Sequence, residues 1–200
     1  MVRNLLKIPG EHNVSNALCA LSIGRVLGLH EPDILRALGR FRGAWRRFEF
    51  KGIMQGAFIF SDYGHHPREI FATLAAARSR FPMRRIWCVF QPHQYQRLQY
   101  LWNDFITSFD LADRILLLPV YDVAGRETKK AKAQVNSVAL AHELLGRGKN
   151  CWHVHSFDHA REFINAETRP GDVVLMMGAG DIYNLTEELV YASQKEAELK

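Results

Sequence analysis

The 200-residue sequence is long enough for one sizeable domain with a small attachment, and its 48% apolar and 24% charged residues are typical of a globular protein. No apolar run approaches the ~18 residues that cross a membrane, and the stretch MVRNLLKIPGEHN lacks the apolar core of a signal peptide, so a cytoplasmic location is expected. The net charge of +5 favours anionic partners such as nucleotides or phosphorylated substrates, although the dispersed basic residues also fit an ordinary solvated surface.

Helical periodicity opens the chain and then gives way to strands. Helices are predicted over residues 13–29, closing on Gly28, and over 31–41, with Pro32 in the first turn. Two strand-like runs follow over 46–52 and 56–63, and the residues between them predict a hairpin turn at Ile53, Met54 and Gln55.

From residue 67 onward, helices and strands alternate. Helices are predicted over 67–79, 98–112, 136–148 and 158–167 and from Ile182 onward, and strands over 84–92, 114–120, 150–155 and 171–181, with a polar loop over 121–134. Short connections between alternating elements predict a mostly parallel sheet with helices on both faces. Cys19, Cys88 and Cys151 lie in apolar stretches and are expected to be buried, reduced thiols.

Polar residues gather where the predicted strands end, which is where such sheets bind ligands. The run Asp62-Tyr63-Gly64-His65-His66-Pro67 offers a carboxylate for ribose hydroxyls or a cation, and a helix start for an anion. The alternative is that His66 only caps the helix and His65 packs under a loop.

The run FQPHQYQR follows the next strand along the chain and places His93 and Arg97 one helical turn apart. Arg97 could bind a carboxylate through two parallel hydrogen bonds, or its side chain could simply be solvated. We expect the ends of the two strands that precede these motifs to be neighbours in the sheet.

Two other patterns resemble ligand-binding motifs but are interpreted as structural features. Gly178 and Gly180 predict a tight turn with a possible phosphate contact, and NAD binding is rejected because no later strand can carry the acidic residue it needs. Cys151, His153 and His155 alternate on one strand, but this is not a usual zinc spacing, so no metal site is predicted.

Five motifs together resemble the C-terminal part of the Mur ligase family, and within it the members that join L-alanine to UDP-N-acetylmuramate. They are IPGEHNVSNALCA (8–20), FRGAWRRFEFKG (41–52), SDYGHHPREI (61–70), FQPHQYQR (90–97) and MGAGDI near the end. The resemblance implies a ligase of peptidoglycan precursor synthesis that uses ATP and Mg²⁺ and proceeds through an acyl phosphate. It implies that residues 1–42 are the last two helices of a central ATP-binding domain and that 43–200 are a C-terminal Rossmann-like domain.

The same resemblance assigns residue roles. It implies nucleotide contacts from Asn13, Asn16, Arg47 and Asp62, amino-acid contacts from Tyr63, His65, Gln94 and Arg97, and catalytic roles for Asp62 and His65. Asn13 and Asn16 share a helical face, from which their amides can meet a purine edge, unless Asn13 merely caps the helix. The family usually shows Arg where this chain has Gln94, so one cationic contact to the amino acid is missing.

The sequence holds no G-x-x-x-x-G-K-[ST] loop. The phosphate-binding loop and the Mg²⁺ ligands are therefore expected in missing N-terminal and central domains, and the chain alone is expected to be inactive. A stand-alone nucleotide- or small-molecule-binding domain without ligase activity is the alternative. Nucleic-acid binding, which would be salt-sensitive, is not favoured.

Overall fold

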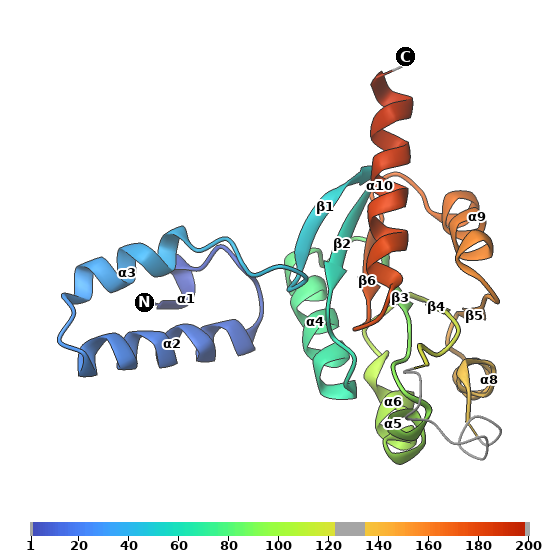
Figure 1. Ribbon diagram of the computed structural model, residues 1–200, viewed down its shortest axis with the longest axis horizontal. Coiled ribbons are helices and arrows are strands. Elements are labelled where there is room, and N and C mark those ends of the chain that lie inside the picture. The colour runs from blue at the N-terminus through green and yellow to red at the C-terminus, as the bar shows by residue number, and fades with distance from the viewer. Residues whose placement is uncertain (1, 123–134, 199–200) are drawn as a thin grey trace.

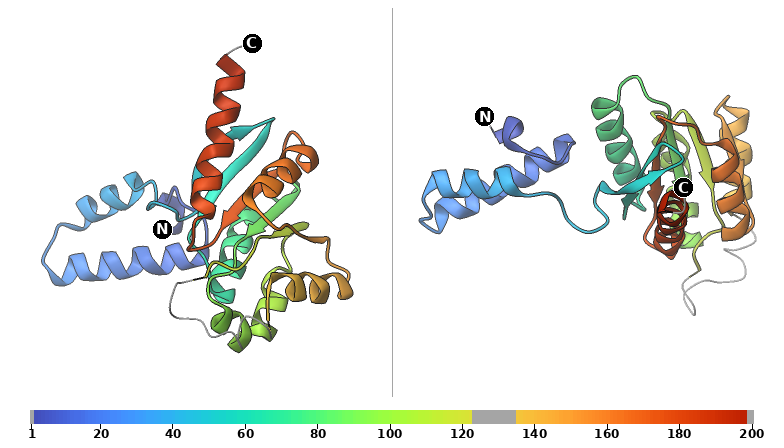
Figure 2. Two further views of the ribbon diagram at one scale, coloured as in Figure 1. Left: turned by 45° about the vertical axis from the view of Figure 1, so that its right-hand side comes forward. Right: turned by 90° about the horizontal axis from the view of Figure 1, so that it is seen from above.

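A helical segment, a linker and a sheet follow one another in the computed structural model, which describes residues 2–122 and 135–198 (Figure 1). The helical segment contains α1 (Val2–Leu5), α2 (Glu11–Val26) and α3 (Glu31–Arg40). The sequence predicts α2 and α3 but not α1, because four residues carry no periodic pattern. The segment projects away from the sheet and is joined to it by the linker 41–48 (Figure 2). The division of the chain into parts of two domains at residue 42 stays a prediction.

The linker leads into a hairpin of β1 (Glu49–Met54) and β2 (Ala57–Asp62). The turn has only two residues, Gln55 and Gly56, with φ values of 49° and 83°. Two positive φ angles are typical of the two-residue turn that matches the twist of a hairpin. The predicted three-residue turn was therefore wrong, since Ile53 and Met54 belong to β1 and pair with β2.

The remaining strands run parallel to β2 and confirm the α/β fold. The sheet has the order β1-β2-β6-β3-β4-β5, and only β1 is antiparallel to its neighbour. The strands are β3 (Ile86–Phe90), β4 (Arg114–Leu117), β5 (Cys151–His153) and β6 (Val173–Met177). The central strands β3 and β6 are buried along their whole length, as their continuous apolar sequences predict.

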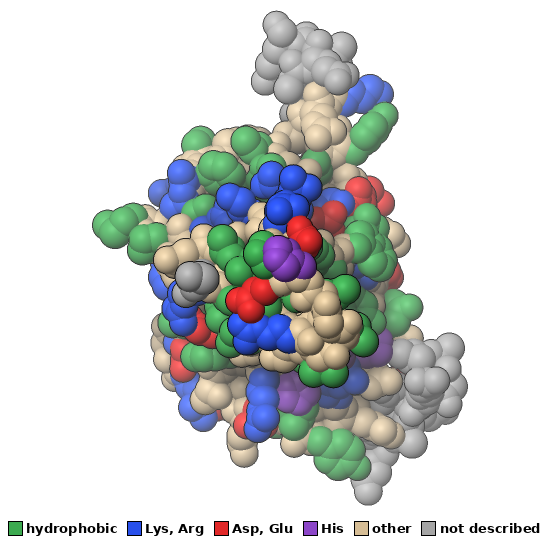
Figure 3. Space-filling view, turned by 90° about the vertical axis from the view of Figure 1, so that its left-hand side faces the viewer, with side chains coloured by type: hydrophobic (Ala, Val, Ile, Leu, Met, Phe, Trp, Pro, Cys, Tyr) green, Lys and Arg blue, Asp and Glu red, His purple; other side chains and the backbone are tan. Residues whose placement is uncertain are grey.

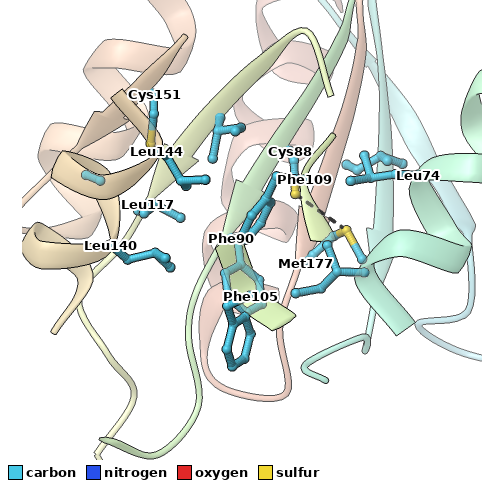
Figure 4. Packing of buried hydrophobic residues seen from close by; sticks show 14 of the residues in the cluster. Leu74, Cys88, Phe90, Phe105, Phe109, Leu117, Leu140, Leu144, Cys151 and Met177 are labelled. Atoms are coloured by element: carbon cyan, nitrogen blue, oxygen red, sulfur yellow. Dashed lines mark hydrogen bonds between the residues drawn. The ribbon is translucent and has the colours of Figure 1, made fainter. Parts of the chain in front are cut away.

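Helices cover both faces of this sheet. They are α4 (Pro67–Arg80), α5 (Tyr95–Tyr100), α6 (Trp102–Ser108), α8 (Ser137–Gly146), α9 (Phe157–Glu167) and α10 (Ile182–Glu198). One apolar core joins α4, α6 and α8 to one face, and a second joins α9 and α10 to the other. Figure 4 shows the first core, in which the thiol of Cys88 lies 3.7 Å from the sulfur of Met177. No helix in the described residues is long and apolar enough to cross a membrane.

The structure corrects two further predictions. The helix expected over 98–112 is two short helices, because the helix is interrupted at Leu101. It also begins earlier than expected, at Tyr95.

Cys19 is exposed, whereas Cys88 and Cys151 are buried as expected. The buried residues of α2 are Ala17, Leu21 and Gly24, and Cys19 lies outside that set. Burial raises the pKa of Cys151 to about 12. The polar loop predicted over 121–134 falls outside the described residues beyond position 122.

Three histidines cluster at the end of β5 and in the residues that follow it. The rings of His153 and His155 have centroids 5.0 Å apart, and those of His155 and His159 are 6.2 Å apart. Cys151 points instead into the first core, and the described residues contain no group of three side chains able to hold a metal ion. Burial lowers the pKa of His153, and the neighbouring His155 and His159 lower it further.

We therefore expect His153 to destabilise the fold on acidification. Its folded pKa lies below its ordinary value of 6.5. The unfolded chain then binds the proton first, so stability is full above about pH 6.5 and falls as the pH drops toward the folded pKa. Between pH 7.5 and pH 5, the melting temperature of His153→Gln should therefore fall less than that of the wild type. The exposed His30→Gln serves as the control, and equal losses in both variants would contradict the expectation.

Candidate functional site

Three strands end side by side at the carboxyl edge of the sheet. Asp62 ends β2, Met177 ends β6 and Phe90 ends β3, and β6 pairs with both neighbours. The expectation that β2 and β3 are neighbours was therefore wrong. Strand β6 is last in the chain but lies between them, and no local pattern reveals this insertion. The turn after β6 consequently lies in the middle of the candidate site.

The turn at Gly178 and Gly180 packs tightly against its neighbours. A Cβ on Gly180 would lie 2.6 Å from Oε1 of Gln91 and 2.7 Å from the ring of Tyr121. The Gln91 amide holds the turn in place, because its Nε2 donates to Asp181 over 2.6 Å and its Oε1 accepts from the backbone of Ile182 over 3.0 Å. The predicted tight turn is confirmed, and close packing explains its glycine.

The carboxylate of Asp62 is buried and engaged by the backbone. Its Oδ2 accepts the N–H of Phe48 over 2.8 Å, and its Oδ1 accepts that of Gly64 over 2.7 Å. Burial raises the pKa of Asp62, although these bonds and the charge of Arg47 act in the opposite direction. The first bond ties the linker to β2, and the second shapes the turn toward His65.

The two adjacent histidines have different surroundings. Nδ1 of His66 accepts from the backbone of Arg68 over 3.2 Å, so the interpretation of His66 as a cap of α4 is confirmed. Glu69 completes the capping box by accepting the backbone N–H groups of His65 and His66. Nδ1 of His65 lies 3.1 Å from the Tyr63 carbonyl and 3.4 Å from Glu69, so its ring is held by two oxygens.

A chain of contacts joins the two predicted site motifs across β6. The ring of His65 makes an edge contact with Tyr63 at 5.4 Å and lies 5.9 Å from the ring of His93. His93 stacks on Tyr121 at 5.4 Å, and its Nδ1 lies 3.4 Å from the guanidinium of Arg97. His93 and Arg97 do lie together, but not through helical spacing, because His93 precedes α5 and forms an isolated bridge with Tyr121.

Gln94 precedes α5 with a φ of 69°, in the left-handed region, and donates its backbone N–H to Tyr121 over 3.2 Å. Its position next to the His93 and Arg97 pair is compatible with the predicted amino-acid contact.

A cavity of about 760 Å³ lies between the helical segment and α4. Asn13 and Asn16 line it from α2, Asp62 and Glu69 from the sheet segment, and Arg47 from the linker. Nδ2 of Asn13 donates to the Pro9 carbonyl over 2.7 Å, and Asn16 approaches the Asn13 amide oxygen at 3.5 Å. Asn13 does not cap α2, because Gly10 holds that position. The four predicted nucleotide residues therefore share one cavity, which is within the size range of small-molecule sites.

Sequence reasoning did not single out Arg46. This residue is 5% exposed, and its guanidinium donates to the carbonyls of Gly178 and Gly180. The neighbouring Arg47 is half-exposed, lies 3.8 Å from Glu69 and covers the ring of Tyr63. Two adjacent arginines thus have opposite environments, and only the contact with a turn 132 residues away distinguishes them.

A parallel sheet with polar strand ends beside a large cavity defines an α/β ligand-binding domain. The chain belongs to the Mur ligase family, since residues 46–180 match the model described as "Mur ligase, glutamate ligase domain".

Relatives extend the similarity to nearly the whole chain. A UDP-N-acetylmuramate–L-alanine ligase of Clostridium tetani is 42% identical over 89% of this chain and 38% of its own, and one of Caldanaerobacter subterraneus is 40% identical over 95% and 40%. The crystal structure of the UDP-N-acetylmuramate-alanine ligase of Thermotoga maritima superimposes with a TM-score of 0.78 and 30% identity, covering 96% of this chain and 40% of that one. A murein peptide ligase of Psychrobacter arcticus, with 24% identity and a TM-score of 0.62 over 94% and 38%, shares the fold. This chain spans about two fifths of the length of these relatives.

Proposed function

We propose that this chain is the C-terminal part of an ATP-dependent ligase that joins L-alanine to UDP-N-acetylmuramate through an acyl phosphate. The observation that carries the proposal is the placement of two sites side by side. The cavity lined by Asn13, Asn16 and Arg47 reaches Asp62, and the next residues of the same turn contact the group around Arg97. The names of the relatives support the choice of substrates.

The cavity suits the adenine and ribose end of ATP. The amides of Asn13 and Asn16 can donate to and accept from a purine edge. The carboxylate of Asp62 accepts two backbone bonds and also interacts with the side chain of Thr73. Two carboxylate oxygens offer about four lone pairs, so one can still accept a ribose hydroxyl. Arg47 lies at the rim, where its charge is available to a phosphate.

The group around Arg97 suits the incoming amino acid. A guanidinium can bind a carboxylate with two parallel hydrogen bonds, and His93 and Tyr121 restrict where Arg97 can point. His65 is held by the Tyr63 carbonyl and Glu69, and it lies between the two sites. We assign it, with Asp62, to orienting the reacting groups.

The remaining chemistry depends on residues outside this chain. Phosphoryl transfer relies on a phosphate-binding loop and Mg²⁺ to neutralise charge in the transition state. The sequence contains no such loop, and it covers about two fifths of its relatives. We place the loop and the Mg²⁺ ligands in the remainder of the ligase, and we propose that the chain by itself does not turn over ATP.

A chimera tests this proposal. The matching segment of the Clostridium tetani relative is replaced by this chain, and phosphate release from ATP is measured. We expect release that requires both L-alanine and UDP-N-acetylmuramate, and none from this chain alone. Arg97→Lys should raise the KM for L-alanine about tenfold or more with little change in the KM for ATP, because lysine cannot make the fork. Gln94→Arg should lower the KM for L-alanine.

Arg147→Lys is the matched control, since Arg147 is an exposed arginine paired with Glu143 far from the site. If Arg97→Lys changes only the ATP dependence, the amino-acid site is misplaced. A chimera that binds ATP but never turns over would favour the alternative of a binding domain without ligase activity.

A further inference from the structure

A second cavity, of about 430 Å³, adjoins the first and has a different lining. Four cationic side chains converge on it from three parts of the chain: Lys7 before α2, Arg42 and Arg47 from the linker, and Arg80 from the end of α4. Figure 3 shows Lys and Arg side chains at several places on the face that the helical segment presents, together with Asp and Glu side chains. We call this cavity the linker cleft.

Of the four cations in the linker cleft, only Arg47 has an acidic partner in the described residues, namely Glu69 at 3.8 Å. Glu49 is its one acidic lining residue, and that carboxylate already accepts the Arg46 backbone over 2.9 Å and lies 3.3 Å from Lys51. In residues 2–122 and 135–198, no carboxylate forms an ion pair with Lys7, Arg42 or Arg80. Lys7, Arg42 and Arg80 are exposed at the rim of the cleft, and the one printed contact of their charged groups is that of Arg80 with the ring of Phe81 at 5.6 Å. An anion that binds among them would be attracted by all three charges.

The walls of the linker cleft are aromatic and already packed. The rings of Phe48 and Phe60 lie 4.8 Å apart, and those of Phe50 and Phe60 lie 5.4 Å apart. Such a wall lowers the local dielectric and strengthens the attraction between the cations and a bound anion.

The linker cleft adjoins the proposed nucleotide site and shares Arg47 with it, but most of its lining is different. Asp62, at the carboxyl end of β2, lines the first cavity, whereas Phe60, two residues earlier, lines the second. Likewise the first turns of α4 line the first cavity, and its last residue, Arg80, lines the second. A ligand in the linker cleft therefore lies farther from the carboxyl edge of the sheet than a ligand in the first cavity does.

We propose that the linker cleft binds a small anion carrying two or more phosphate groups. Arginine forks favour phosphate, and the volume is within the range of small-molecule sites. The ligand contacts Lys7 in the helical segment, Arg42 in the linker and Arg80 in the sheet segment. A ligand that bridges these three residues ties the helical segment to the sheet segment.

Isothermal titration calorimetry of the chain with pyrophosphate and with tripolyphosphate tests this proposal. We expect saturable binding that weakens with added salt and falls at least about tenfold in Arg80→Glu. The control Arg36→Glu makes the same charge change at an exposed residue paired with Asp33 on α3, and it should bind like the wild type.

Two results would overturn the proposal. One is the absence of saturable binding at millimolar pyrophosphate, and the other is an equal loss in Arg80→Glu and Arg36→Glu, which would indicate a general effect of net charge. Citrate, titrated in parallel, separates phosphate from any polyanion, and equal affinity for citrate would reject the phosphate assignment. Asn16→Ala should leave pyrophosphate binding unchanged, and loss of binding in that variant would place the anion in the nucleotide cavity.

Discussion

The substitution Arg46→Met should lower the free energy of unfolding by about 3 kcal/mol, since two bonds from a buried charge are lost. The guanidinium donates to the carbonyls of Gly178 and Gly180 and lies 5.0 Å and 5.2 Å from the rings of Tyr63 and Tyr183. Methionine fills part of the volume but leaves both carbonyls without this donor.

The loss is smaller than a sum of these contacts would give. Burial lowers the pKa of Arg46, and its Nε has no partner, so placing the charge there already has a cost. Removing the charge recovers that cost. The net effect remains large because methionine cannot donate to the carbonyls of Gly178 and Gly180. The backbone bonds of residue 46 to Tyr63 and Glu49 do not depend on its side chain and should persist in the variant.

The next residue provides the matched control. Arg47→Met makes the same chemical change at a half-exposed side chain whose ion pair with Glu69 spans 3.8 Å, so its effect on stability should stay within about 0.5 kcal/mol. Urea unfolding of both variants, followed by circular dichroism, measures the difference. Equal losses would contradict the anchoring role of Arg46.

The contrast between these two arginines marks what the sequence could not predict. The order of most helices and strands and the start of α4 at Pro67 follow from local patterns, and the structure confirms them. The burial of Arg46 depends on a turn 132 residues away. Local reasoning had no signal for that contact.

Sheet order was the other property hidden from local patterns. A strand is recognised by its own residues, but its neighbours depend on how the crossovers pack. Strand β6 enters between β2 and β3, and the turn at Gly178 thus comes to lie beside Asp62, whose carbonyl accepts the Gly178 N–H over 3.1 Å. The two site motifs are nevertheless brought together, because His65 and His93 reach across the gap.

The carboxylate of Asp62 has a structural role whether or not a nucleotide binds. Asp62→Ala should lower the free energy of unfolding by about 2–4 kcal/mol, because the buried N–H groups of Phe48 and Gly64 lose their acceptor. Asp181→Ala is the control, because this exposed aspartate in the turn between β6 and α10 accepts one bond from Gln91. Its loss should cost less than about 1 kcal/mol.

A second substitution, Asp62→Asn, distinguishes the structural role of the Asp62 carboxylate from its proposed role in ATP binding. Burial raises it despite two hydrogen bonds, so the ionised side chain is held at a cost to stability that a neutral residue would avoid. Asp62→Asn keeps the shape and one acceptor and should therefore be more stable than Asp62→Ala. In the chimera, however, it should raise the KM for ATP about tenfold, because a charge-assisted bond to a ribose hydroxyl is lost. If Asp62→Asn keeps the wild-type KM for ATP, the carboxylate serves only to join the linker to β2, and the nucleotide must be held by Asn13, Asn16 and Arg47 alone.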